Sequence, residues 1–229
     1  MQEFFSLPLG SGWRDEEIAF MHLGYSGVIL RMRNKTIAFD VANLLTSDEV
    51  NAIQNLDLLL FTHGHDDHYK LKDTLEIFNA TEAKIVAEPS VANDLNGKIP
   101  PEKLLSAEPG GTYDIDNCRI TAISGIHRGP NNLYHVKSGE LSILHCGDSG
   151  YVSLKDYPAK IAFLPTGDPS PTASPKDAVR MALDVRPKYA VAIHGSGNQN
   201  KDFEKELKKK MPETTVIIPE RRRSKKVAI

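Results

Sequence analysis

The chain has 229 residues, 40% of them hydrophobic, which is enough to bury one sizeable core, and we expect a single domain over residues 1–229. Its 28 basic and 30 acidic residues give a formal net charge of -2, so no global positive field is available to hold a polyanion. No apolar run approaches the roughly 18 residues that span a bilayer, and the N-terminus lacks a signal-peptide pattern, which predicts no membrane contact. Cys118 and Cys146 form no CxxC pair, which favours a reducing compartment, the cytoplasm.

Short apolar runs alternate with turn signals and helical segments in the first half of the chain, which predicts an α/β architecture. Strands are expected at residues 18–23, 28–33, 36–40, 58–61 and 84–87. The polar turn Arg33-Asn34-Lys35 should close a hairpin. Helices are expected over residues 47–55 with Ser47 as N-cap, over 72–79, and from Ser90 to a stop at Gly97.

The second half continues in the same style, with strands expected at residues 119–124, 141–145, 161–164, 189–193 and 216–218. Ser174 followed by Pro175 has the pattern of a capped helix start, and this helix should end before Pro187. Another helix is expected over residues 202–211. The proline-rich loop 165–175, with Thr166 and Asp168, either borders a pocket or is a rigid connection, and both interpretations stay open.

Residues 61–69, FTHGHDDHY, concentrate metal-binding residue types directly after a predicted strand. His63 and His65 are two apart, so they point to the same side if the chain is extended there. Asp67 and His68 follow where the chain must turn into a helix, and a turn can aim both side chains at a second point nearby. Divalent ions bind this mixture of imidazole nitrogen and carboxylate oxygen, so the stretch predicts a metal site rather than a solvated loop.

The stretch from His63 to His68 resembles the HxHxDH motif of the metallo-β-lactamase superfamily. The similarity extends along most of the chain, because further residues match the later motifs of that family: Asp40, His127, Asp148 and His194. The resemblance implies the family's four-layer αββα sandwich, which is an α/β fold. It also implies two divalent metal ions as cofactors, zinc in the first place and manganese or iron as alternatives.

The resemblance further implies a role for each matching residue. The first metal would be bound by His63, His65 and His127, and the second by Asp67, His68 and His194, with Asp148 as a bridge. Asp40 would accept hydrogen bonds and orient the histidine loop without touching metal. Cys146 is a candidate ligand, although a small buried hydrophobe is the preferred interpretation. The remaining histidines are expected to be structural: His22, His135 and His145.

Two such ions would share a water molecule and present a bridging hydroxide to a carbonyl or phosphoryl centre. Asp148 is then a catalytic candidate through its bridge, and Asp67 through delivery of a proton to the leaving group. No GxSxG motif indicates a serine nucleophile.

The segments Leu23-Gly24-Tyr25 and Leu164-Pro165-Thr166-Gly167 resemble the stand-alone branch that includes ascorbate-phosphate lactonases. The favoured function is therefore hydrolysis of an ester, a lactone or a phosphorylated small metabolite, with a small molecule as partner. One alternative is a phosphodiesterase or nuclease, because the basic tail 221–226 could contact phosphate, although a solvated charge run is preferred. A second alternative is an iron-dependent oxidoreductase of the same superfamily. Nothing in the sequence indicates the oligomeric state.

Overall fold

The computed structural model describes residues 17–32, 34–53, 55–168 and 172–229. The N-terminal residues 1–16, Arg33 of the predicted hairpin turn and residues 169–171 of the proline-rich loop lie outside the described residues. The chain divides into two compact units, each built on its own sheet. The first unit comprises Met1–Ala107 with Glu220–Ala228, and the second comprises Glu108–Pro219 with Ile229.

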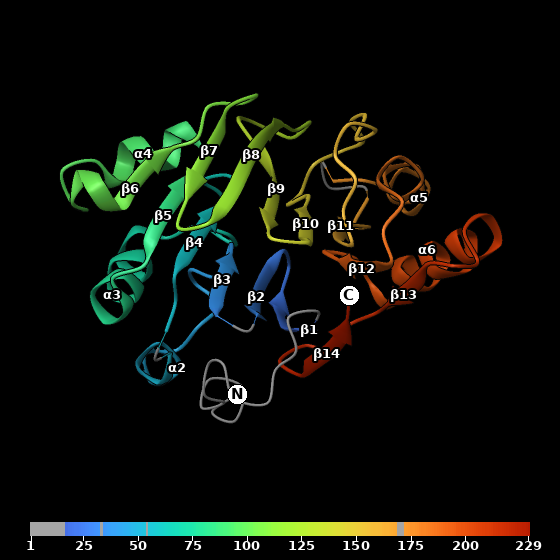
Figure 1. The fold of residues 1–229 in the computed structure, drawn as a ribbon, viewed down its shortest axis with the longest axis horizontal. Helices are drawn as coiled ribbons and strands as arrows, with labels where there is room; N and C mark the ends of the chain where they lie inside the picture. Colours follow the sequence, from blue (N-terminus) through green and yellow to red (C-terminus); the bar gives the residue numbers. More distant parts are fainter. Residues whose placement is uncertain (1–16, 33, 54, 169–171) are drawn as a thin grey trace. The chain divides into compact units, whose positions relative to one another are not determined.

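The first unit contains a seven-stranded sheet in the order β14-β1-β2-β3-β4-β5-β6 (Figure 1). Its strands are β1 (Glu17–Gly24), β2 (Gly27–Met32), β3 (Lys35–Phe39), β4 (Leu58–Phe61), β5 (Lys84–Ala87), β6 (Leu104–Ser106) and β14 (Ser224–Ala228). The strands from β14 to β3 pair antiparallel, and those from β3 to β6 pair parallel. Parallel strands need crossover connections. These contain α2 (Ser47–Ala52), α3 (Leu71–Thr81), α4 (Pro89–Leu95) and the 3-10 helix η1 (Pro101–Lys103).

The predicted strands of this unit are present, and the fully buried run Leu58–Phe61 lies in the centre of the parallel part. The predicted N-cap of α2 is wrong by one residue, because Thr46 caps the helix. Its hydroxyl accepts the N–H of Glu49, and the Glu49 carboxylate accepts the N–H of Thr46. This capping box satisfies two amide groups at once, which a cap at Ser47 would not do.

The second unit also contains a seven-stranded sheet, in the order β13-β12-β11-β10-β9-β8-β7. Its strands are β7 (Thr112–Ile115), β8 (Cys118–Ser124), β9 (Asn132–Ser138), β10 (Leu141–His145), β11 (Ile161–Pro165), β12 (Tyr189–Ile193) and β13 (Thr215–Ile217). The strands from β7 to β10 pair antiparallel, and those from β10 to β13 pair parallel. The helices are α5 (Pro175–Val185) and α6 (Gly197–Lys210).

Helix α5 has the predicted start, since the Ser174 hydroxyl accepts the N–H of Asp177. Helix α6 begins five residues earlier than the predicted Asp202, because Ser196 and Gln199 form a second capping box. No helix among the described residues is long and apolar enough to cross a membrane.

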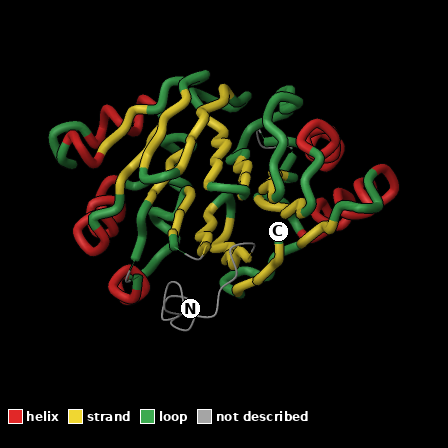
Figure 2. Tube along the Cα trace, viewed as in Figure 1, coloured by secondary structure: helices red, strands yellow, loops and turns green. Residues whose placement is uncertain are grey.

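The basic side chains of the tail are mostly exposed, as expected for a solvated charge run, but the backbone of the tail is part of a sheet. Residues Ser224–Ala228 form β14, which pairs antiparallel with β1 (Figure 2). The turn before it is held by Arg222, which donates to the Leu44 carbonyl at 2.8 Å and pairs with Glu49. The tail therefore completes the edge of the first sheet.

Candidate metal centre

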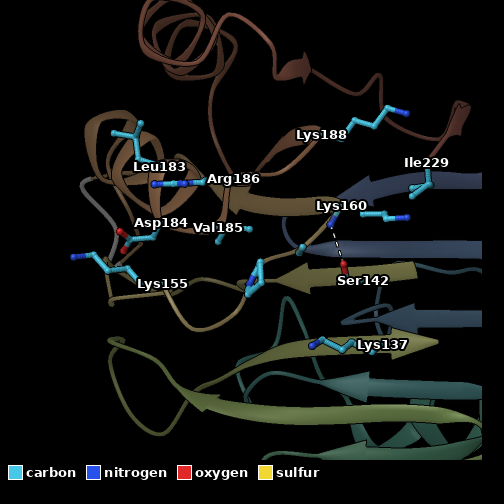
Figure 3. Close-up of a pocket in the computed structure, with 12 residues that line it drawn as sticks. Lys137, Ser142, Lys155, Lys160, Leu183, Asp184, Val185, Arg186, Lys188 and Ile229 are labelled. Carbon is cyan, nitrogen blue, oxygen red and sulfur yellow. Dashed lines mark hydrogen bonds between the residues drawn. The ribbon is translucent and has the colours of Figure 1, made fainter. Parts of the chain in front are cut away.

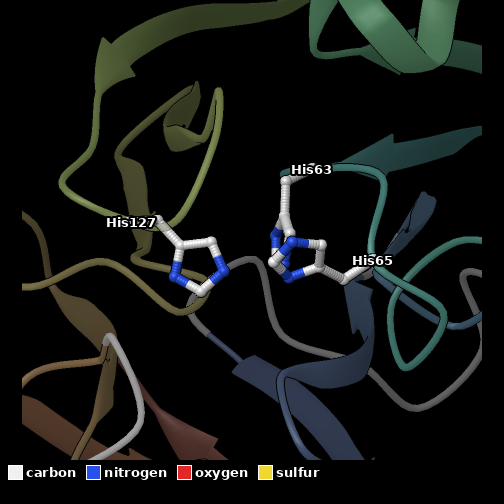
Figure 4. A group of neighbouring side chains, drawn as sticks. All are labelled: His63, His65 and His127. Carbon is white, nitrogen blue, oxygen red and sulfur yellow. The ribbon is translucent and has the colours of Figure 1, made fainter.

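The candidate ligands of the first unit lie on the loop between β4 and α3. The backbone N–H groups of His68 and Tyr69 both donate to the carbonyl of His65 at 2.9 Å, which turns the chain sharply after His65. The His63 ring centroid lies 4.6 Å from that of His65 and 4.0 Å from that of His68. Figure 4 shows the rings of His63 and His65 next to each other. The three imidazoles of this stretch therefore lie close together, and their role as metal ligands stays a prediction.

Asp40 determines which nitrogen atoms these imidazoles present. Its buried carboxylate accepts the Thr62 N–H at 2.8 Å, the Thr62 hydroxyl at 2.7 Å and Nδ1 of His68 at 3.0 Å. The Thr62 hydroxyl has one proton and donates it to Asp40, so its oxygen accepts from Nδ1 of His63, 3.0 Å away. Both rings therefore carry their proton on Nδ1. In a neutral imidazole, Nε2 is then the atom with the lone pair that binds metal.

The candidate ligands of the second unit follow three different strands. Asp148 follows the carboxyl end of β10, and His194 follows that of β12. These strands run parallel on either side of β11, so their carboxyl ends meet at one edge of the sheet. The structure brings the two side chains together, with Oδ2 of Asp148 3.0 Å from Nε2 of His194.

His127 lies on the loop between β8 and β9, which Figure 4 shows. This loop is tied to the Asp148 loop, because the Ile126 N–H donates to the Ser149 hydroxyl at 2.9 Å and the Gly150 N–H donates to the Ile126 carbonyl at 2.6 Å. The contact places His127 next to the Asp148 segment.

The start of the proline-rich loop, at Thr166 and Gly167, packs tightly against His194 and Gly195. A Cβ on Gly167 would lie 1.9 Å from the His194 carbonyl oxygen, and a Cβ on Gly195 would lie 1.9 Å from the Thr166 hydroxyl. Thr166 in turn donates to Oδ1 of Asn200 at 2.6 Å. Thr166 therefore supports the His194 segment, while the side chain of Asp168 carries no such contact among the bonds of the described residues.

The donor atoms within each unit have the spacing of ligands that share an ion. Oδ2 of Asp67 is 3.6 Å from Nε2 of His68, and the corresponding distance between Asp148 and His194 is 3.0 Å. A tetrahedral ion with bonds of 2.0–2.1 Å separates neighbouring ligand atoms by about 3.3 Å. Both distances lie close to this value, and the mixture of imidazole and carboxylate donors suits zinc, manganese or iron. The residues fit a divalent metal.

Both cysteines are buried thiols that form no disulfide. Cys146 packs within the apolar core of the second unit, which confirms that it is a small buried hydrophobe. Burial raises the pKa of its thiol far above the usual range, so the thiolate that metal binding requires is disfavoured.

The three histidines that were expected to be structural have backbone partners. Nε2 of His22 lies 2.9 Å from the Tyr25 carbonyl, Nε2 of His135 lies 3.0 Å from the Pro158 carbonyl, and Nδ1 of His145 accepts the Gly147 N–H at 3.2 Å. These contacts agree with the structural interpretation, which stays a prediction. Sequence reasoning missed Thr62, whose position directly before His63 was the available signal.

Comparisons with known proteins agree with this geometry. Residues 19–194 match the family model described as a Beta-lactamase superfamily domain. A UPF0173 metal-dependent hydrolase of Lysinibacillus sphaericus is 30% identical over 198 residues, which cover 75% of this chain and 82% of that protein.

Among solved structures, the chain is similar to Igni18, a metallo hydrolase from Ignicoccus hospitalis, with a TM-score of 0.77 and 20% identity over 93% of this chain and 99% of that one. It is also similar to YhfI from Bacillus subtilis, described as a metallo-beta-lactamase fold protein, with a TM-score of 0.70 and 14% identity over 93% and 100%. At these identities the two likenesses show a shared fold.

Proposed function

The chain belongs to the metallo-β-lactamase superfamily and is a metal-dependent hydrolase of that family, and we propose that it uses two divalent metal ions to hydrolyse a small molecule. Its metallo-β-lactamase fold, predicted from the sequence motifs, is confirmed. The observation that carries the proposal is the Asp40 network, because it directs Nε2 of both His63 and His68 toward metal binding.

We propose two metal-binding sets, as the family resemblance implies. His63, His65 and His127 form one set of side chains that could hold an ion, and Asp67, His68, Asp148 and His194 form the other. Asp148 would bridge the two ions, as the family resemblance implies. We propose that residues 1–229 work as one domain, because the family model matches residues 19–194, which include parts of both units. Zinc is the first choice of metal, with manganese and iron as alternatives.

When bound, such ions would lower the pKa of a coordinated water molecule and would stabilise negative charge on a carbonyl or phosphoryl oxygen. Asp148 would contribute its carboxylate to holding the metal. It is buried, and its Oδ2 lies 3.0 Å from Nε2 of His194. Asp67 is more exposed, with a side-chain accessibility of 35%, and would deliver a proton to the leaving group. Asp40 would keep the imidazoles oriented through its hydrogen bonds.

The proposed substrates are an ester, a lactone or a phosphorylated small metabolite. The contacts of the basic tail support a small molecule over nucleic acid, because two of its cations are paired with residues of the first unit. Arg222 holds Leu44 and Glu49, and Lys226 pairs with Glu17 at 2.8 Å. Cations that are already paired within the protein are less available to bind the phosphates of a nucleic acid backbone.

Elemental analysis of the purified protein, together with assays on a p-nitrophenyl phosphodiester and a simple lactone, tests the proposal. We expect about two metals per chain and measurable hydrolysis of one substrate. Asp148→Ala should abolish that hydrolysis, while the control Asp202→Ala, an exposed carboxylate on α6, should retain it. A folded chain that binds no transition metal after reconstitution would overturn the proposal.

A further inference from the structure

A basic pocket lies in the second unit. The cavity has a volume of about 830 Å³. Five cationic side chains line it: Lys137, Lys155, Lys160, Arg186 and Lys188 (Figure 3). The acidic side chain on its lining, Asp184, is already engaged, because Oδ2 accepts the Tyr151 hydroxyl and the Leu154 N–H, both at 3.1 Å. The lining therefore carries a strong excess of positive charge.

The five cations are not neutralised by the protein. Within the described part of the chain, none of them forms an ion pair, although other basic side chains of the same unit do. Arg119 pairs with Asp114 at 2.9 Å, for example, and Lys208 pairs with Glu204 at 2.7 Å. Like charges that converge on one cavity repel each other unless an anion lies between them.

A structural explanation exists for one of these cations. Arg186 is the C-cap of α5, and a cation is favoured at the negative end of a helix dipole. The lysines come from other segments: Lys137 from β9, Lys155 from the loop after β10, and Lys160 and Lys188 from the positions just before β11 and β12. Capping of one helix does not account for their gathering.

The pocket is separate from the candidate ligands of the same sheet. Lys160 and Lys188 precede the amino ends of β11 and β12, whereas Asp148 and His194 follow the carboxyl ends of β10 and β12. At about 3.3 Å per residue, roughly 15 to 20 Å of strand separates the two ends. A ligand in the basic pocket would not contact these metal-binding side chains.

We propose that this pocket binds a phosphorylated small molecule of nucleotide size. Several converging cations recognise a multiply charged anion through charge-assisted hydrogen bonds. The cavity volume falls within the range of ordinary small-molecule sites. Apolar lining residues, Leu183, Val185 and Pro158, would contact the carbon skeleton or base of such a ligand. A ligand that carries both phosphates and an apolar group would contact both the cationic and the apolar residues of the lining.

The test is calorimetric titration of the full chain with its metals in place, using ATP and inorganic tripolyphosphate as probes at physiological salt. We expect a saturable site for ATP that the double variant Lys160→Gln/Lys188→Gln weakens about tenfold or more. The matched control is Lys208→Gln/Lys209→Gln, which removes the same charge from the exposed last turn of α6. It should leave the affinity unchanged.

Each outcome decides the proposal. Tighter binding of ATP than of tripolyphosphate supports a nucleotide, and equal affinities with the same lysine dependence support recognition through the phosphates alone. Equal weakening in both double variants would mean a diffuse charge effect, and an unchanged ATP affinity in the first variant would place the ligand elsewhere. Either result would contradict the proposal that this pocket binds a phosphorylated molecule. If the first variant does not fold, Lys137→Gln/Lys155→Gln provides the same test from other segments.

Discussion

Asp40 and His68 are joined by a 3.0 Å hydrogen bond between two side chains that are both fully buried. Asp40 adopts a positive φ of 51° at the end of β3, a conformation that Asp and Asn tolerate better than most residues. This backbone conformation places the Asp40 carboxylate where it accepts hydrogen bonds from Thr62 and His68. Its replacement should affect metal binding without removing a ligand.

Asp40→Asn should lower metal affinity by about 10- to 100-fold, the usual effect of losing a partner that orients a ligand. The amide oxygen can still accept the Thr62 N–H, but the amide nitrogen cannot accept from Nδ1 of His68. Metal retention against a chelator measures the effect. Asp57→Asn, which changes an acceptor of the Thr36 N–H, is the control. Equal retention by both variants would show that Asp40 does not orient the site.

Gly167→Ala should destabilise the protein by about 1 to 3 kcal/mol, because the added methyl group has no room. Its Cβ would lie 1.9 Å from the His194 carbonyl oxygen and 2.9 Å from Nδ1 of the same residue. Gly197→Ala is the matched control, since its Cβ meets nothing within 4 Å. Urea unfolding measures both. If the Gly167→Ala variant is as stable as the control, the segments around Gly167 and His194 can move apart to make room for the methyl group.

Arg222→Ala should lower the free energy of unfolding by roughly 1 kcal/mol. The change removes the bond to the Leu44 carbonyl and the pair with Glu49 that anchor the turn before β14. Arg223→Ala should shift stability by less than about 0.5 kcal/mol, because both partners of its pair with Glu220 are largely exposed. Thermal unfolding of the two variants measures the difference. Equal losses of stability in both would contradict an anchoring role for Arg222.

His135 should make the protein less stable as the pH falls. Burial lowers the pKa of His135 below its ordinary value, so the folded chain favours the neutral ring. The unfolded chain therefore binds a proton first. The stability that the neutral ring contributes is present above pH about 6.5 and is lost as the pH falls toward the lower pKa of the folded state.

His135→Gln removes this titration and keeps a donor for the Pro158 carbonyl. Unfolding by urea between pH 8 and pH 5 should show a steeper loss for the native chain than for the variant. Parallel pH profiles would mean that His135 titrates alike in the folded and unfolded chains. His22→Gln, a histidine of the other unit, serves as the comparison.

Apolar runs were sufficient to predict most strands, because burial of consecutive residues is a property of a local segment. Leu58–Phe61 and Lys84–Ala87 have the bounds that the sequence indicated. The four-residue β7 and the buried β9, Asn132–Ser138, were missed. Polar residues interrupt β9, and its burial depends on the neighbouring strands β8 and β10. β14 was missed for the same reason, since its partner β1 lies at the other end of the chain.

The sequence by itself predicted the metal-binding chemistry of this protein, because the candidate ligands between His63 and His68 are adjacent in the chain. Only the tertiary structure decided how those ligands are oriented and supported. The proton positions on His63 and His68 follow from Asp40 and Thr62, and His194 is packed against Gly167. The basic pocket likewise appears only when separate strands bring their lysines to one end of a sheet. Residue type is carried by the chain, whereas hydrogen-bond partners and charge convergence depend on contacts between distant segments.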